Sequence, residues 1–178
     1  MKGKQTVLDM VRSLAVIGAI VALIYIFIPH DDEADPTRVV DYRVELITAR
    51  RAAPYPVAAP AGLPADWRAT SVSYQRKNSD AWHLGFLDPG NQYVAVEQST
   101  DPGVDKFIRA VTQRAEATEA TQRAGELTWE RWEGPKYNAL VRKDRGYTTV
   151  VTGTGSFEQL GTMAASLELK KGEEPTKG

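Results

Sequence analysis

The sequence predicts an α+β protein, in which an N-terminal transmembrane helix precedes one domain with an antiparallel sheet of about six strands and two packed helices. Three observations support this prediction. Residues 13–29 carry no charged side chain, apolar and polar residues alternate repeatedly between residues 67 and 154, and residues 101–113 and 156–168 have helical periodicity. With 178 residues, 42% of them hydrophobic, the chain has enough material for one core of ordinary size.

The uncharged run at residues 13–29 has the composition of a membrane span. As a helix it is about 25 Å long, which is near the lower limit for crossing a bilayer. A buried core helix is one alternative, but apolar residues occur on every side of the run. A cleaved signal peptide is another, but bulky residues stand where a small-residue cleavage site is needed. The predicted membrane anchor consists of Leu14, Val16, Ile17, Ile20, Leu23, Ile24, Ile26 and Phe27.

The charges on either side of this run predict its orientation. Three basic residues precede it and four acidic residues follow it, namely Lys2, Lys4 and Arg12, then Asp31, Asp32, Glu33 and Asp35. The positive-inside rule therefore places residues 1–12 in the cytoplasm and the domain outside it, in a single-pass protein of the cell membrane with the lipid bilayer as a partner. The chain has no cysteine, which excludes disulfides and a lipid-modified cysteine, and its net charge of −1 gives no reason to expect nucleic acid.

Two connecting segments follow. Residues 30–53 are expected to form a juxtamembrane helix or linker, since Asp35 and Pro36 are typical of a helix start. Residues 54–66 are a proline-rich strap, in which the prolines restrict the backbone and the larger side chains can pack on the domain. A free polyproline ligand for a partner is the alternative interpretation. The strap residues singled out are Pro54, Tyr55, Pro56, Pro60, Leu63 and Pro64.

The exported domain is expected to span residues 67–168. A turn at residues 88–91 with Asn91 in a left-handed conformation pairs Leu84 with Val96, and the same register places His83 opposite Glu97. Residues 115–124 fit a helix or a strand, and we favour a strand. A capping box at Ser156 begins the last helix, and residues 169–178 are expected to be a disordered tail.

The sequence offers few residues for catalysis, and no catalytic, cofactor or metal residue is predicted. His83 is the only histidine after residue 30, and there is no cysteine to act as nucleophile or metal ligand. His83, Glu97 and a serine such as Ser73 can be drawn as a triad, but a cross-strand pair on the less buried face of the sheet is the favoured interpretation. The "GTGS" at residues 153–156 resembles a phosphate cradle, but a strand-to-helix turn capped by Ser156 explains it more simply.

Four tryptophans, Trp67, Trp82, Trp129 and Trp132, raise the possibility of a sugar-binding platform. Trp129 and Trp132 point to opposite faces of one strand, so one of them is expected near the surface. Together with His83 and Glu97 they form the predicted ligand or partner surface.

Several stretches carry a resemblance to a known family. These include "RRAAPYPVAAPAGLPADWRATSVSY", "WHLGFL", "YVAVEQS", "TWERW" and "TTVVTGTGSFEQLGTMAASL". The chain resembles the domain of unknown function 4245 family of single-span actinobacterial membrane proteins, which implies no activity or catalytic residue. A looser similarity, in Pro64 and Trp67 and in the "MAASL" near the end, is to the sensory C-terminal domains of extracytoplasmic sigma-factor regulators; it concerns fold and not function.

From these features we expect a membrane-anchored, extracytoplasmic protein-binding module, acting as an accessory subunit or adaptor of an envelope membrane complex. The partner is then an integral or envelope membrane protein. The alternative is an envelope ligand sensor or a module that binds glycans or lipids, and an enzyme is the third hypothesis.

Overall fold

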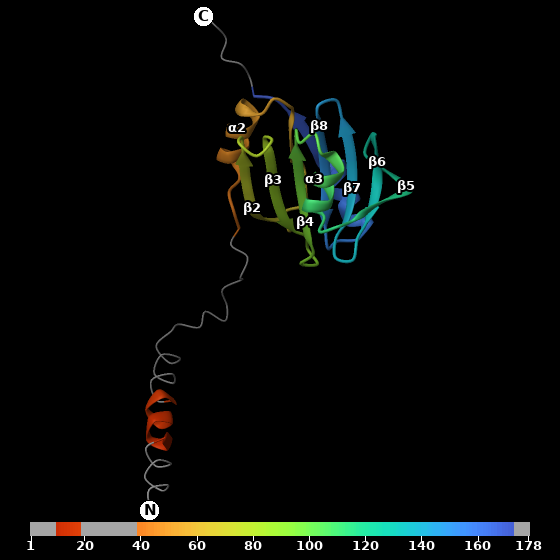
Figure 1. Cartoon of the computed structure of the whole chain (residues 1–178). Helices are drawn as coiled ribbons and strands as arrows, with labels where there is room; N and C mark the ends of the chain where they lie inside the picture. The colour runs from red at the N-terminus through yellow and green to blue at the C-terminus, as the bar shows by residue number, and fades with distance from the viewer. Residues whose placement is uncertain (1–9, 19–38, 173–178) are drawn as a thin grey trace, which may run out of the picture. The chain divides into compact units, whose positions relative to one another are not determined.

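The computed structural model describes residues 10–18 and 39–172 (Figure 1). The chain divides into two compact units, Met1–Pro36 and Thr37–Gly178, and each is described by itself. Within the first unit, residues 10–18 are helical, and Leu14, Val16 and Ile17 are exposed on that helix. Ile20, Leu23, Ile24, Ile26 and Phe27 of the predicted anchor lie outside the described residues. Within residues 10–18 and 39–172, no helix combines the length and the hydropathy needed to cross a membrane.

The second unit contains three helices and nine strands in its described part. The helices are α2 (Arg43–Ala52), α3 (Val104–Val111) and α4 (Phe157–Ser166). The strands are β1 (Val57–Pro60), β2 (Arg68–Gln75), β3 (Ala81–Leu87), β4 (Tyr93–Ser99), β5 (Glu116–Ala124), β6 (Leu127–Glu133), β7 (Asn138–Asp144), β8 (Tyr147–Gly153) and β9 (Leu167–Lys170).

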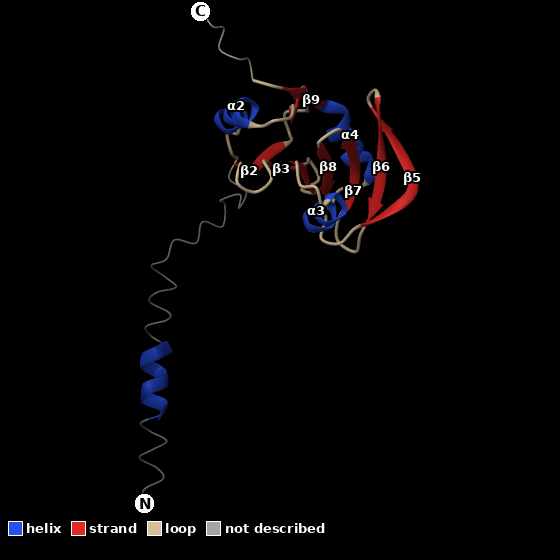
Figure 2. Ribbon diagram, turned by 45° about the horizontal axis from the view of Figure 1, so that its top comes forward, coloured by secondary structure: helices blue, strands red, loops and turns tan. Residues whose placement is uncertain are grey.

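Seven strands form one antiparallel sheet in the order β2-β3-β4-β8-β7-β6-β5 (Figures 1 and 2). The β3–β4 hairpin has the predicted register, with Leu84 opposite Val96 and His83 opposite Glu97. Its turn depends on Asn91, whose φ of 57° lies in the left-handed region that asparagine tolerates. The ambiguous segment at residues 115–124 is largely strand, as favoured.

Each face of the large sheet is covered by different elements. On one face, α2, α4 and the β1–β9 pair enclose the main core, which includes Trp82, Leu84 and Leu160. Ser156 and Gln159 form the predicted capping box at the start of α4. On the other face, α3 packs its apolar side, with Ile108 fully buried, against β6, β7 and β8 (Figure 2). At the β2–β3 end of that face, Ser71, Ser73 and His83 are only partly buried.

The structure corrects the predicted fold class. The sheet has seven strands and not about six, a second sheet of two strands is present, three helices pack on the domain, and no described helix is long and apolar enough to span a membrane. The segment before the strap, expected to be a helix or linker over residues 30–53, is described only from residue 39. Residues 39–42 are not helical, because the amide of Val40 donates to the carbonyl of Ala69 on β2 at 2.8 Å, and α2 begins only at Arg43.

The expected tail at residues 169–178 is corrected as well, since its first two residues belong to β9. This strand pairs antiparallel with β1, from Val57 opposite Lys170 to Pro60 opposite Leu167. The strap therefore contains a strand, β1. The strand that pairs with it, β9, comes much later in the sequence, after α4.

Candidate functional site

The strap is attached to the large sheet by side chains. Tyr55 is 3% exposed, and its ring stacks on that of Tyr147 with 5.1 Å between centroids. The indole Nε1 of Trp82 donates to the carbonyl of Ala58 at 2.9 Å. Further along, Pro56, Pro60 and Leu63 are half-buried, while Pro54 and Pro64 are exposed.

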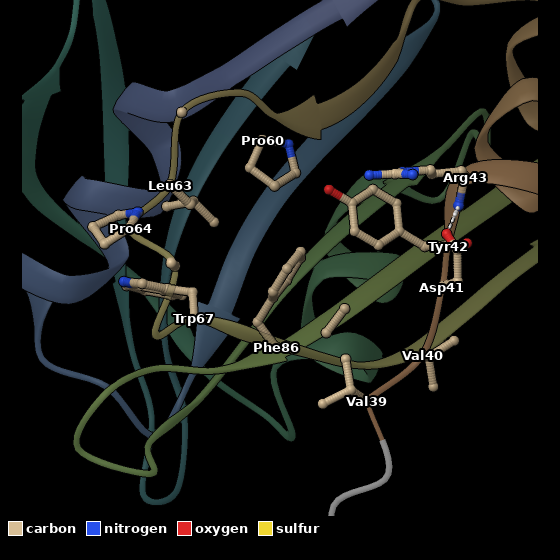
Figure 3. A pocket seen from close by; sticks show the side chains of 13 residues that line it. Val39, Val40, Asp41, Tyr42, Arg43, Pro60, Leu63, Pro64, Trp67 and Phe86 are labelled. Carbon is tan, nitrogen blue, oxygen red and sulfur yellow. Dashed lines mark hydrogen bonds between the residues drawn. The ribbon is translucent and has the colours of Figure 1, made fainter.

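The second half of the strap forms one wall of a cleft of about 480 Å³, here called the strap cleft (Figure 3). Residues 39–43 form the opposite wall, and Phe86 lies between them. The full lining is Val39, Val40, Asp41, Tyr42, Arg43, Pro60, Gly62, Leu63, Pro64, Ala65, Trp67, Ala69 and Phe86.

Both walls of the strap cleft are held by local contacts. Tyr42 meets Phe86 edge-on, with centroids 5.8 Å apart and an interplanar angle of 72°. On the strap side, Gly62 turns the chain with a φ of 74°, and the amide of Trp67 donates to the carbonyl of Pro64 at 3.1 Å. These contacts position the rings of Tyr42 and Phe86 and the turn that carries Trp67.

The lining of the strap cleft is mostly apolar, with charge only at residues 39–43. Asp41 and Arg43 are both exposed, and the Arg43 amide donates to the Asp41 carboxylate at 3.0 Å. Such a surface suits an apolar ligand that carries a few polar groups at one side.

A polar cluster lies at the β2–β3–β4 end of the large sheet, on the face that α3 partly covers. Glu97 Oε1 lies 2.6 Å from Nδ1 of His83, and Nε2 of His83 lies 2.7 Å from Oγ of Ser71. The predicted pair of His83 and Glu97 is therefore brought together by β3 and β4. Trp129 and Trp132, the other members of the predicted surface, are not part of it.

The serine in this cluster is Ser71 and not Ser73. Ser73 is directly opposite His83, but the imidazole leans toward Gly85, which pairs with Ser71. A Cβ on Gly85 would stand 2.4 Å from Oγ of Ser71, so only glycine leaves room for this hydrogen bond. The signal in the sequence that points to this serine is the glycine two residues after His83.

Neighbouring groups shift the pKa values in this cluster. Burial lowers the pKa of His83, but the hydrogen bond and the negative charge of Glu97 raise it, and the net pKa lies above the usual 6.5. Burial, helped by the charge of Glu97, raises the pKa of Tyr93 to about 12, against a smaller lowering by the hydroxyl of Ser71. Tyr93 therefore keeps its phenolic proton at neutral pH and can act as a donor.

The expectation that Trp129 or Trp132 lies near the surface is wrong. They are 1% and 3% exposed. They do point to opposite faces of β6, but Trp129 enters the main core and Trp132 enters the core under α3. Trp82 is also buried, which leaves Trp67 in the strap cleft as the half-buried tryptophan of the described chain.

The "GTGS" turn caps α4 with its own residues. The amide of Ser156 donates to Oε1 of Gln159 at 2.6 Å, so this donor is occupied within the chain. Across residues 10–18 and 39–172, no group of three or more histidine, aspartate or glutamate side chains is placed to hold a metal ion.

Comparison with known families agrees with the resemblance in the sequence. The family described as "Protein of unknown function (DUF4245)" matches residues 2–167. The chain belongs to the DUF4245 family. A search of curated proteins finds no match. The DUF4245 match ends at the residue where β9 begins, so it includes the strap, the strap cleft and the polar cluster.

Proposed function

We propose that this DUF4245 protein is a protein-binding module whose strap cleft receives an extended apolar segment of a partner, in the role of an accessory subunit or adaptor. The observation that carries the proposal is the cleft itself, in which the half-buried Tyr42 and Trp67 present aromatic surface beside the buried ring of Phe86. Aromatic grooves of this kind bind extended and proline-containing segments, because such segments lose little entropy on docking.

The charged residues at the rim of the cleft favour a polypeptide as the partner. Asp41 and Arg43 place opposite charges side by side at one wall, which suits the alternating donors and acceptors of a peptide backbone. The side chains of the partner would then lie between Leu63 and Phe86.

A photo-crosslinker at position 67 tests the proposal. The protein carrying p-benzoylphenylalanine at Trp67 should form one discrete adduct with a partner protein in the native host, and the double change Leu63→Ser and Val39→Ser, at positions of the cleft lining that are not buried, should abolish it. The same crosslinker at exposed Thr128 on β6 serves as the control, since that position lies away from the cleft. Equal adducts from both positions, or none from position 67, would count against the proposal.

A small envelope ligand, such as a lipid or glycan fragment, is the second candidate function. The volume of the cleft favours it, because 480 Å³ lies in the range of small-molecule sites. Tryptophan fluorescence separates the two functions, since Trp67 lines the cleft and the other three tryptophans are buried. Lipid or glycan fragments that change the emission of the wild type, but not of Trp67→Phe, would favour the second function.

The location of the protein stays a prediction. A domain outside the cytoplasm is expected from the basic residues before position 13 and the acidic residues at positions 31–35. Protease added to cells without their wall should digest the domain, whereas recovery of an intact chain from the cytosolic fraction would contradict both this location and association with the bilayer.

A further inference from the structure

Ser71, His83 and Glu97 form a continuous hydrogen-bonded chain across three neighbouring strands. The distances of 2.7 Å and 2.6 Å lie in the range that links a nucleophile, its general base and an orienting carboxylate. The two nitrogens of the imidazole have different partners: Nε2 faces Ser71 and Nδ1 faces Glu97. With Nδ1–H donating to Glu97, the Nε2 lone pair is left to accept the proton of Ser71.

A hydrogen-bond donor stands beside the serine. The hydroxyl of Tyr93 lies 3.0 Å from the point where a Cβ of Gly85 would stand, and Oγ of Ser71 lies 2.4 Å from the same point. Because Tyr93 keeps its proton at neutral pH, it can donate to an oxygen that becomes negative next to Ser71.

A cavity adjoins this chain of residues. It has a volume of about 340 Å³ and is lined by His83 and Glu97. Ser71 lies outside this lining and is connected to it by its hydrogen bond to Nε2 of His83. Its opposite wall is α3, which contributes the apolar side chains of Phe107, Ala110 and Val111. A short acyl group can pack on this wall while its carbonyl faces the polar side.

We propose that Ser71, His83 and Glu97 are a serine-dependent esterase centre for small carboxylic esters with short acyl chains. Oγ of Ser71 attacks the carbonyl carbon and His83 Nε2 takes the serine proton. When the ester C–O bond breaks, His83 returns this proton to the leaving alcohol. Water then attacks the acyl-serine with the same proton transfers, which releases the carboxylic acid and restores Ser71. Tyr93 donates to the oxyanion in both halves.

The test uses the full chain with a fluorophosphonate probe and with p-nitrophenyl butyrate. Intact-mass and peptide-mass spectrometry should find one probe per chain, on Ser71, and hydrolysis of the ester should exceed the uncatalysed rate. Ser71→Ala should abolish labelling, and His83→Gln should slow it about 100-fold, because general-base catalysis contributes roughly that much or more. Ser79→Ala, a serine outside the cluster, should label like the wild type.

A second variant separates chemistry from folding. Ser71→Cys places a thiol beside His83, and its alkylation by iodoacetamide should be faster than in the double change Ser71→Cys and His83→Gln, with circular dichroism showing that both remain folded. Absence of probe on Ser71 in folded wild-type protein, undiminished labelling in Ser71→Ala, or equal alkylation of the two cysteine variants would each overturn the proposal. Crosslinking at the strap cleft is unaffected by any of these outcomes, so the two proposals fail separately.

Discussion

The side-chain carbonyl of Gln98 accepts a hydrogen bond of 2.7 Å from the amide of Ala58. Nε2 of the same glutamine donates to the carbonyl of Pro56 at 3.2 Å and to Oγ1 of Thr149 at 3.0 Å. This buried side chain of β4, together with the indole of Trp82, therefore joins the strap to the large sheet by hydrogen bonds.

Replacing Gln98 with methionine should lower the free energy of unfolding by about 2–3 kcal/mol. Methionine preserves most of the volume but leaves the buried amide of Ala58 without its acceptor, and an unmade buried hydrogen bond costs about this much. Urea denaturation measures the change. Gln75→Met, at an exposed position, should stay within about 0.5 kcal/mol of the wild type. Equal stability of the two variants would mean that Gln98 does not anchor the strap.

Two substitutions of Tyr55 should distinguish the contribution of its ring to stability from that of its hydroxyl group. The hydroxyl donates to the carbonyl of Asp80, and the ring stacks on Tyr147. Tyr55→Phe should cost about 1 kcal/mol for the lost hydrogen bond, whereas Tyr55→Ser should cost about 3 kcal/mol through lost burial. Thermal melting followed by circular dichroism gives both values, and an unchanged melting temperature in Tyr55→Ser would make the strap a loose spacer.

Gly153 should not tolerate alanine. A Cβ at this position would stand 1.8 Å from the carbonyl oxygen of Tyr93, which is backbone of the neighbouring strand and has no room to move. We expect Gly153→Ala to lose more than about 3 kcal/mol of stability or to fail to fold. Gly90→Ala is the matched control, since its Cβ meets ordinary contacts at 3.4 Å and beyond. Soluble, cooperatively unfolding Gly153→Ala protein would contradict the strand geometry.

The stabilising effect of His83 should depend on pH. The charged or titratable groups around it are Glu97 and Tyr93 on β4, and Asp101 and Lys106, which line the same cavity. Because the folded pKa of His83 lies above its usual 6.5, the stabilisation is complete below pH 6.5 and is lost as the pH rises through the folded pKa. His83→Gln should therefore cost more stability at pH 5.5 than at pH 8.5.

Denaturation of the wild type and of His83→Gln at these two pH values measures the difference. In the Glu97→Gln background the cost of His83→Gln should become nearly independent of pH, because the carboxylate that raises the pKa is gone. If His83→Gln lost more stability at pH 8.5 than at pH 5.5, the result would contradict the pairing of His83 with Glu97.

The strands of the large sheet were predictable because each carries its own signal. Alternation in residues 81–99 and the turn at Asn91 determine the hairpin and the position of His83 opposite Glu97. The β1–β9 pair carries no such signal. Each strand has four residues, β1 includes Pro60, and the two strands lie far apart in the sequence. The local pattern therefore predicts a strap at residues 57–60 and a tail at residues 169–170.

The candidate sites were only partly predictable. The strap cleft depends on how residues 39–43 return to β2, and the cap-like Asp35 and Pro36 favoured a continuous helix through that segment. Ser71 was missed because its contact with His83 runs diagonally across β2 and β3 over Gly85, next to a register shift between Ala69 and Ser71. Local periodicity does not encode such a diagonal contact.

The pairing of β1 with β9 also governs when the domain is completed during synthesis. Val57 is made long before Lys170, so β1 cannot pair with its partner strand until β9 has been made. The pairing of β1 with β9 is thus a late step, and nascent chains stalled before residue 167 lack the strand that pairs with the strap.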